Sequence, residues 1–217
     1  MKNFSAVLFD LDGTLIDSEY FYYSNWAPIL FSSFGLAITF EDWIHEYAGH
    51  TLVRNVNYLN ERYGFDTTEE YMWKATRANY AKSDMRAIEL MPYAKEILID
   101  LKNRDIHIGL VTSSYQTTVD TVLGHHGLLD YFEFFITREV VAQPKPNGEP
   151  YLRALEKLGL HKENVVAVED TITGVTSAKA AGLQCIAVSK HETERHRLLA
   201  KSDILLRSMD ELLPFVC

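Results

Sequence analysis

The stretch Val7-Leu8-Phe9-Asp10-Leu11-Asp12-Gly13-Thr14-Leu15 places two carboxylates directly after a short apolar run. An unbroken row of Val, Leu and Phe is typical of a strand that is buried on both faces. In an open parallel sheet, ligands bind outside the carboxyl ends of the strands. Two like charges at the tip of a buried strand add nothing to its stability. The pattern therefore favours a functional role for Asp10 and Asp12.

The composition of the 217-residue chain excludes several classes of protein. Its formal net charge of −9 argues against non-specific binding to nucleic acid or to an anionic membrane surface, which needs basic patches. No apolar run approaches the ~20 residues of a membrane-spanning helix. Cys185 and Cys217 stand alone, so we expect neither a disulfide framework nor a zinc site. The residues before the first strand leave no room for a signal peptide, and we expect a cytoplasmic protein.

Strand patterns alternate with helix patterns in most of the chain. Besides residues 4–11, apolar runs predict strands at 106–112, 132–136, 165–168 and 185–188, with a short edge strand at 203–206. Helices are predicted between these strands, and one of them has an apolar stripe of Leu152, Leu155 and Leu158. The alternation predicts an α/β fold with a doubly wound parallel sheet, which is a Rossmann-like core.

One segment of the chain lacks any convincing strand pattern. Its helical spacing predicts four consecutive helices, at 18–34, at 39–49, at 52–63, and from Thr67 or Thr68 to about 82. Thr39 and Asp42 form a weak variant of a capping box at the start of the second helix. We therefore expect a core domain of residues 1–17 and 88–217, with a helical domain of residues 18–87 inserted into it.

Polar residues that lie far apart in the sequence directly follow the predicted strands. Right-handed crossovers place the carboxyl ends of all these strands at one edge of the sheet. Two like charges ~4 Å apart repel by about 4 kcal/mol at an effective dielectric of ~20, and Lys145 is the only obvious cation in the set. The edge is expected to collect Asp10, Asp12, the run Thr112-Ser113-Ser114, the loop that holds Lys145, and the pair Glu169-Asp170.

A divalent cation would offset the repulsion among these carboxylates. Oxygen ligands without His or Cys favour a hard ion, with Mg²⁺ before Mn²⁺ or Zn²⁺. A metal, Lys145, and hydroxyl and backbone donors together predict a site for a phosphoryl group. In such a site one carboxylate can attack phosphorus. A second carboxylate, in a different environment, can exchange protons with the leaving oxygen and with water.

Four motifs, in this order, resemble the signatures of the haloacid dehalogenase superfamily. Any one of them is weak evidence, whereas all four in order are very specific. The helical insertion directly after the first motif is similar to the helical cap of the beta-phosphoglucomutase-like branch. The resemblance covers essentially the whole chain. The motifs are Asp10-Leu11-Asp12-Gly13-Thr14-Leu15, Val111-Thr112-Ser113-Ser114, Lys145-Pro146, and Glu169-Asp170-Thr171 followed by Gly174.

The resemblance implies roles for the acidic residues. Asp10 is the expected nucleophile and a Mg²⁺ ligand. Asp12 is expected to act as the general acid and base, and to offer its backbone carbonyl to the metal. Asp170 is an expected metal ligand, and Glu169 is expected either to bind the metal or to support its neighbours.

The resemblance also implies a set of phosphate-binding residues. Thr112, the Ser113 amide and Lys145 are expected to hold the phosphoryl oxygens during catalysis, although Thr112 could instead cap the next helix. Lys145 would also screen the nucleophile from the charge of its substrate. The loop departs from the family pattern, because it reads Pro146-Asn147-Gly148-Glu149 where relatives have Pro-x-Pro-Asp. We expect this loop to be more flexible than theirs.

Two further comparisons with the family narrow the activity. Dehalogenases lack the second acid of the first motif, so the presence of Asp12 favours phosphate chemistry. Beta-phosphoglucomutases carry a histidine at the position of Tyr22 and an arginine at that of Leu52, and both are missing here. His50 and Arg54 lie just after Gly49, in a loop that could face the site. Together with Tyr22 they are the candidate substrate contacts of the helical domain.

We therefore expect a Mg²⁺-dependent phosphohydrolase that cleaves a small phosphate monoester, of sugar phosphate, phosphoglycolate or nucleotide type, through an aspartyl-phosphate. The alternative enzyme is a sugar-phosphate mutase of the beta-phosphoglucomutase type. A non-catalytic binding module on a degenerate scaffold is the alternative outside enzymes. The expected partner is a small phosphorylated metabolite, with no nucleic acid and no membrane. We expect a monomer, with a dimer as the alternative.

Overall fold

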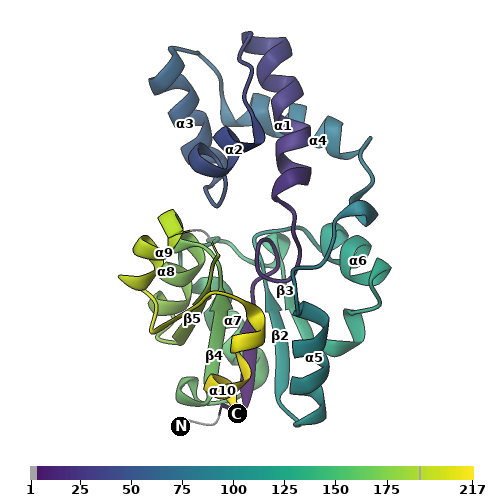
Figure 1. The fold of residues 1–217 in the computed structure, drawn as a ribbon, viewed down its shortest axis with the longest axis vertical. Coiled ribbons are helices and arrows are strands. Elements are labelled where there is room, and N and C mark those ends of the chain that lie inside the picture. The colour runs from purple at the N-terminus through teal and green to yellow at the C-terminus, as the bar shows by residue number, and fades with distance from the viewer. Residues whose placement is uncertain (1–3, 191) are drawn as a thin grey trace. The chain divides into compact units, whose positions relative to one another are not determined.

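The computed structural model describes residues 4–190 and 192–217, and the chain forms two compact units. One unit comprises Met1–Asp17 and Glu89–Cys217, and the other is Ser18–Ile88. The chain thus returns to the first unit one residue later than the sequence analysis placed the boundary. Among the described residues, the named strands all belong to the first unit (Figure 1).

The first unit is built on a six-stranded parallel sheet. Its strands lie in the order β3-β2-β1-β4-β5-β6, and every neighbouring pair is parallel. This arrangement confirms the α/β fold with a doubly wound sheet, including the short edge strand near the end of the chain. The strands are β1 (Ala6–Phe9), β2 (His107–Val111), β3 (Phe134–Ile136), β4 (Val165–Glu169), β5 (Gln184–Val188) and β6 (Ile204–Leu206).

Helices cover both faces of this sheet (Figure 1). On one face, α7, α8 and α9 enclose the main apolar core, which includes the fully buried strand residues Leu8, Ala167 and Cys185. On the other face lies α10, whose Pro214 and Phe215 line a cavity together with Val166 and Ile186 of the sheet. Because both faces are covered, the strands read as continuous apolar runs in the sequence. The helices of this unit are α5 (Ala94–Asn103), α6 (Gln116–His125), α7 (Glu149–Leu158), α8 (Ile172–Ala180), α9 (Glu192–Leu199) and α10 (Leu213–Val216).

Helix α7 packs on the sheet with a different stripe from the expected one. Leu152 is 53% exposed, whereas Tyr151 and Ala154 are fully buried. The face toward the core therefore runs through Tyr151, Ala154, Leu155 and Leu158, at the spacing i, i+3, i+4, i+7. The stripe predicted from the leucines alone was wrong at its first position. With this face toward the core, the hydroxyl of Tyr151 lies in the interior.

In the second unit, side-chain caps mark the starts of α2, α3 and α4, whereas the side chain of Ser18 before α1 makes no capping hydrogen bond. Thr39 and Asp42 exchange hydrogen bonds with each other's backbone amides at the start of α2, which confirms the capping box. Thr68, and not Thr67, caps α4 by accepting a hydrogen bond from the Tyr71 amide. A second apolar core, rich in Trp and Tyr, lies among these helices. They are α1 (Glu19–Phe34), α2 (Phe40–Glu46), α3 (Leu52–Tyr63) and α4 (Glu69–Tyr80).

The register of the central strands places two of the candidate residues, Asp10 and Glu169, at one level. β1 lies between β2 and β4, and Phe9 pairs with both Leu110 and Val168. The next residue of each strand is therefore level with the others at the carboxyl edge of the sheet. These next residues are Asp10, Val111 and Glu169.

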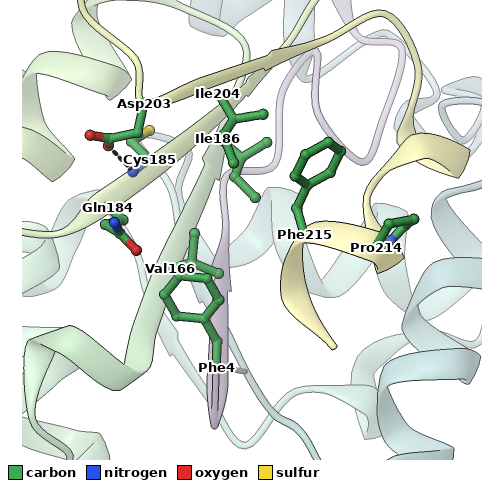
Figure 2. A pocket seen from close by; sticks show the side chains of 9 residues that line it. All are labelled: Phe4, Val166, Gln184, Cys185, Ile186, Asp203, Ile204, Pro214 and Phe215. Atoms are coloured by element: carbon green, nitrogen blue, oxygen red, sulfur yellow. Dashed lines mark hydrogen bonds between the residues drawn. The ribbon is translucent and has the colours of Figure 1, made fainter. Parts of the chain in front are cut away.

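A cavity of about 500 Å³ lies between the sheet and α10 (Figure 2). Val166 and Gln184 contribute from near the starts of β4 and β5, whereas the candidate functional residues follow the ends of the strands. The cavity shares no residue with the candidate site. Its lining consists of Phe4, Val166, Gln184, Cys185, Ile186, Asp203, Ile204, Pro214 and Phe215.

Within the described part of the chain, no helix combines the length and the apolar character that a membrane crossing requires.

Candidate active site

Lys145 links the strand ends through three hydrogen bonds. Its ammonium group donates to Asp10 Oδ1 at 2.6 Å, to Glu169 Oε1 at 2.6 Å and to the carbonyl of Val111 at 2.7 Å. An ammonium group carries three protons, so these bonds use all of its donors. Lys145, Asp10 and Glu169 are buried, with 6%, 8% and 1% of their surface exposed. The structure therefore brings together three of the residues that the strand-end argument selected.

The loop that carries Lys145 is held by hydrogen bonds on both sides. The Lys145–Pro146 peptide bond is cis. The Glu149 carboxylate accepts hydrogen bonds from two backbone amides at the start of the loop, and the Asn147 carbonyl accepts one from the hydroxyl of Ser177 on α8. These contacts restrain the loop despite its departure from the family pattern. Its greater flexibility relative to the loops of relatives stays a prediction.

Burial and the contact between Lys145 and the carboxylates dominate the electrostatics of the site. Burial raises the pKa of Asp10 to about 8, against the lowering influence of Lys145, and the nearby carboxylates of Glu169 and Asp12 add to the rise. Burial alone would lower the pKa of Lys145, but Asp10 and Glu169 outweigh it and hold this pKa above its ordinary value. Lys145 is therefore charged, and it does not by itself balance the carboxylates around it.

Asp10 and Asp12 lie in different environments. Asp12 is only half-buried, and its Oδ2 accepts a hydrogen bond of 2.6 Å from the hydroxyl of Ser114. Asp10 is buried beside a lysine. A difference of this kind is what two carboxylates need if one is to act as a nucleophile and the other is to carry a proton. Ser114 was expected at the same edge of the sheet, but without a role in the chemistry.

Thr112 and Ser113 follow β2 at the same edge. Thr112 is buried, its amide donates to the Ile136 carbonyl, and its hydroxyl oxygen accepts from the Ser114 amide. Ser113 is exposed. The alternative role of Thr112 as the cap of the next helix is wrong, because α6 begins at Gln116 and its amide donates to Glu139. The phosphate-binding roles of Thr112 and Ser113 stay predictions.

Asp10, Glu169 and Asp170 form a cluster that could hold a cation. Each offers a carboxylate oxygen, and these three oxygens lie within 4.8 Å of one another. Glu169 Oε2 is buried and has no hydrogen-bond partner. A buried charged oxygen without a partner is costly, and a bound metal or a metal-bound water would satisfy it. The all-oxygen donor set fits Mg²⁺.

Two glycines of the sequence motifs make room for this cluster. A Cβ atom on Gly13 would lie less than 3.0 Å from the Asp170 carboxylate, and a Cβ atom on Gly174 would lie less than 3.0 Å from that of Glu169. Gly13 also has a positive φ of 78°, which favours glycine. The glycines of the first and fourth motifs therefore clear the space that the two acidic side chains occupy.

Tyr151 is a member of the site that the sequence analysis did not identify. Its hydroxyl donates a hydrogen bond of 2.6 Å to Glu169 Oε1, the same oxygen that binds Lys145. Burial raises the pKa of this hydroxyl well above its ordinary value, so the group stays protonated and donates. The spacing i, i+3, i+4, i+7 that starts at Tyr151 could have indicated that this residue faces the core. The three leucines at 152, 155 and 158 favoured a different face of the helix.

The three candidate substrate contacts all belong to the helical unit. Tyr22 packs on its core, with its ring centroid 6.0 Å from that of Tyr80. Arg54 donates to the carbonyl of Glu46, and its guanidinium carbon lies 4.7 Å from the ring centroid of Tyr58. The roles of Tyr22, His50 and Arg54 toward a substrate stay predictions.

The comparison with protein families matches residues 7–188 to the model of the haloacid dehalogenase-like hydrolases. The chain belongs to this family. The matched residues include all four motifs and the whole helical insertion.

Relatives of the chain within the family are named as phosphatases. The pyrophosphatase PpaX of Oceanobacillus iheyensis is 30% identical over 85% of this chain and 83% of its own. The phosphoglycolate phosphatase of Nitrosococcus oceani is 27% identical over 87% of this chain and 85% of its own. A solved structure from Thermotoga maritima, provisionally assigned as a beta-phosphoglucomutase, superposes with a TM-score of 0.76 at 28% identity and covers 97% of both chains. Family and relatives together support a phosphatase-type hydrolase.

Proposed function

We propose that this haloacid dehalogenase-like hydrolase is a Mg²⁺-dependent phosphatase that cleaves a small phosphate ester through an aspartyl-phosphate on Asp10. The observation that carries the proposal is the buried triad of Lys145 with Asp10 and Glu169, directly beside the carboxylate of Asp170. A carboxylate beside a cation and a prospective metal site is suited to attack a phosphorus atom whose charged oxygens would otherwise repel it.

Asp10, Glu169 and Asp170 would hold the metal ion, and the Asp12 carbonyl is the further ligand that the family resemblance implies. When bound, Mg²⁺ would neutralise charge on the phosphoryl oxygens. Lys145 would add a fixed positive charge at Asp10, because it already contacts the nucleophile. The cation and the lysine would both favour the ionised form of Asp10, opposing the effect of burial on its pKa.

The chemistry divides between the two aspartates. Asp10 forms a bond to phosphorus while the bond from phosphorus to the ester oxygen breaks, and Asp12 gives its proton to the departing oxygen. Asp12 then takes a proton from a water molecule, whose oxygen attacks phosphorus and releases Asp10 with inorganic phosphate. Ser114 donates to Asp12 and would hold this carboxyl in one orientation through both steps.

The substrate class rests on the relatives. Two of them are named for pyrophosphate and phosphoglycolate, both of which are small phosphorylated molecules. We propose a small phosphorylated metabolite as substrate and place its selection in the helical unit, with Tyr22, His50 and Arg54 as the candidate contacts. A panel of phosphoglycolate, pyrophosphate, sugar phosphates and nucleotides would identify the substrate among these classes.

The decisive variant is Asp10→Asn, which keeps the shape of the side chain and removes the nucleophile. We expect no turnover of an aryl phosphate and an unchanged far-UV circular dichroism spectrum. EDTA should abolish the activity of the wild-type protein, and added Mg²⁺ should restore that activity. Full activity of the folded variant, or activity indifferent to chelation, would overturn the mechanism or the metal assignment respectively.

The mutase remains the second candidate because of the likeness to the Thermotoga maritima structure. Tyr22 and Leu52 stand where mutases carry the histidine and the arginine of their cap, which favours hydrolysis. Incubation with beta-glucose 1-phosphate and a bisphosphate primer separates the two activities. A 6-phosphate product would indicate a mutase, and free phosphate a phosphatase.

A further inference from the structure

The hydroxyl of Tyr151 reaches the carboxylate cluster from the core side. Tyr151 lies in the first turn of α7 and is completely buried. Its hydroxyl lies 2.6 Å from Glu169 Oε1, and its ring centroid lies 5.2 Å from the ammonium nitrogen of Lys145. One side chain thus contacts both the lysine and the glutamate of the site, through its ring and its hydroxyl respectively.

The two oxygens of Glu169 have unequal surroundings. Oε1 accepts hydrogen bonds from both Lys145 and Tyr151, whereas the buried Oε2 has no partner. Two donors that meet at one oxygen fix the rotation of a carboxylate more firmly than one donor does. The absence of a side chain at Gly174 leaves the space in which the carboxylate keeps this rotation.

We propose that Tyr151 is a positioning residue for metal binding, which turns Glu169 so that Oε1 serves Lys145 and Oε2 is kept for Mg²⁺ or for a water on the ion. This inference rests on the proposed function, since it gives a purpose to the same carboxylate cluster. Tyr151 itself touches neither the reacting atoms nor the metal. It acts through Glu169, in the manner of outer hydrogen-bond partners that orient the ligands of a metal.

A substitution can separate the contribution of the Tyr151 hydroxyl from that of its ring. Tyr151→Phe keeps the ring, its packing in the core and its contact with Lys145, and removes only the donor to Oε1. The carboxylate of Glu169 is then held at Oε1 by Lys145 alone. Loss of such an outer partner lowers metal affinity or activity by about 10–100-fold. We expect the dissociation constant for Mg²⁺ to rise by at least about tenfold in this variant.

The experiment titrates MgCl₂ into the full-length wild-type and Tyr151→Phe proteins by calorimetry, without substrate. The gain in melting temperature with added Mg²⁺ is measured in parallel, since a ligand that binds the folded state stabilises it by mass action. Tyr47→Phe is the matched control, because Tyr47 is an equally buried tyrosine of the helical unit with 1% of its surface exposed. The control should bind Mg²⁺ as the wild type does.

Kinetics distinguish positioning from simple structural support. With Mg²⁺ raised to saturation, kcat and the substrate KM of Tyr151→Phe should return close to the wild-type values, while the Mg²⁺ concentration for half-maximal rate stays raised. A purely structural role would lower the melting temperature and leave the Mg²⁺ dissociation constant unchanged. Equal Mg²⁺ affinities of the wild type and Tyr151→Phe would overturn this inference and leave the phosphatase proposal standing. A wild-type protein that bound no Mg²⁺ would overturn both.

Discussion

Replacement of Lys145 by methionine tests whether this one cation compensates the buried carboxylates. Methionine is of similar length and apolar, so it fills the space without the charge. The substitution removes three hydrogen bonds of 2.6–2.7 Å and leaves Asp10 and Glu169 buried without their shared partner. Breaking a buried ion pair by removing one partner costs about 3–5 kcal/mol. For a chain of this length, each kcal/mol corresponds to roughly 2–4 °C in melting temperature, so we expect a loss of about 6–20 °C.

The assay is thermal unfolding in EDTA at pH 9, above the pKa of about 8 of Asp10, followed by circular dichroism. Lys179→Met is the matched control, because Lys179 forms an ion pair of similar length, 2.7 Å, with Asp203, but both side chains are more than one-third exposed. An exposed pair of this kind contributes about 0–1 kcal/mol, so the control should melt within about 4 °C of the wild type. If Lys145→Met melted as close to the wild type as the control does, the reasoning from buried charge would be refuted.

The pH dependence of the loss in melting temperature gives an independent check on its cause. Lys145 lowers the pKa of Asp10, so its removal raises this pKa further in the folded state. Below the folded-state pKa the carboxyl group binds a proton and no longer carries an uncompensated charge. The deficit of Lys145→Met in melting temperature should therefore stay constant below about pH 8 and grow as the pH rises above 8, where Asp10 is ionised beside Lys145 in the wild type but still binds a proton in the variant. A deficit that did not change with pH would point to lost packing rather than to charge.

Two further predictions follow from the same site. Gly174→Ala should destabilise the protein by about 1–3 kcal/mol in a denaturation assay and raise the Mg²⁺ concentration that activity requires, because the new methyl group overlaps the Glu169 carboxylate. Gly124→Ala within α6 is the control, because a Cβ atom there would meet only Leu129 at 3.5 Å. The control should be neutral or stabilising in the same assay. In metal-free protein the pKa of Asp10 is raised from 3.8 to about 8, so its contribution to stability is complete below pH 4 and is lost as the pH rises through 8. The melting temperature of Asp10→Asn relative to wild type should therefore increase between pH 5 and pH 8 in EDTA, and parallel curves would contradict the raised pKa.

The sequence was sufficient to predict the position of most site residues along the sheet. Asp10 directly follows β1, Thr112 follows β2, and Glu169 ends β4, so the parallel topology alone places them at one edge. Lys145 was identified by its motif, and the structure brings it to Asp10 over 135 positions. These predictions succeeded because the carboxyl ends of parallel strands must converge, whatever the details of side-chain packing.

The contacts that orient the acids could not be predicted in this way. Ser114 meets Asp12 across 102 positions, and Tyr151 meets Glu169 across 18. Each depends on a rotamer and on the rotation of a loop or helix about its own axis. Helix α7 shows this sensitivity, because Leu152 and the neighbouring Tyr151 point about 100° apart around the axis of an α-helix. That rotation decides whether the hydroxyl faces the site or the solvent.

By itself, the sequence determined the order of strands and helices, the place of the helical insertion and the edge of the sheet where the polar residues gather. Periodicity and strand ends carry this information locally, residue by residue. Only the tertiary structure decided which atoms meet at that edge. It showed that Lys145 donates all three of its hydrogen bonds within the site and that only one of the two Glu169 oxygens has a hydrogen-bond partner. It also showed that two glycines leave room for the carboxylates of Glu169 and Asp170. Such pairings depend on close packing of distant segments, where a shift of about an ångström makes or breaks a hydrogen bond.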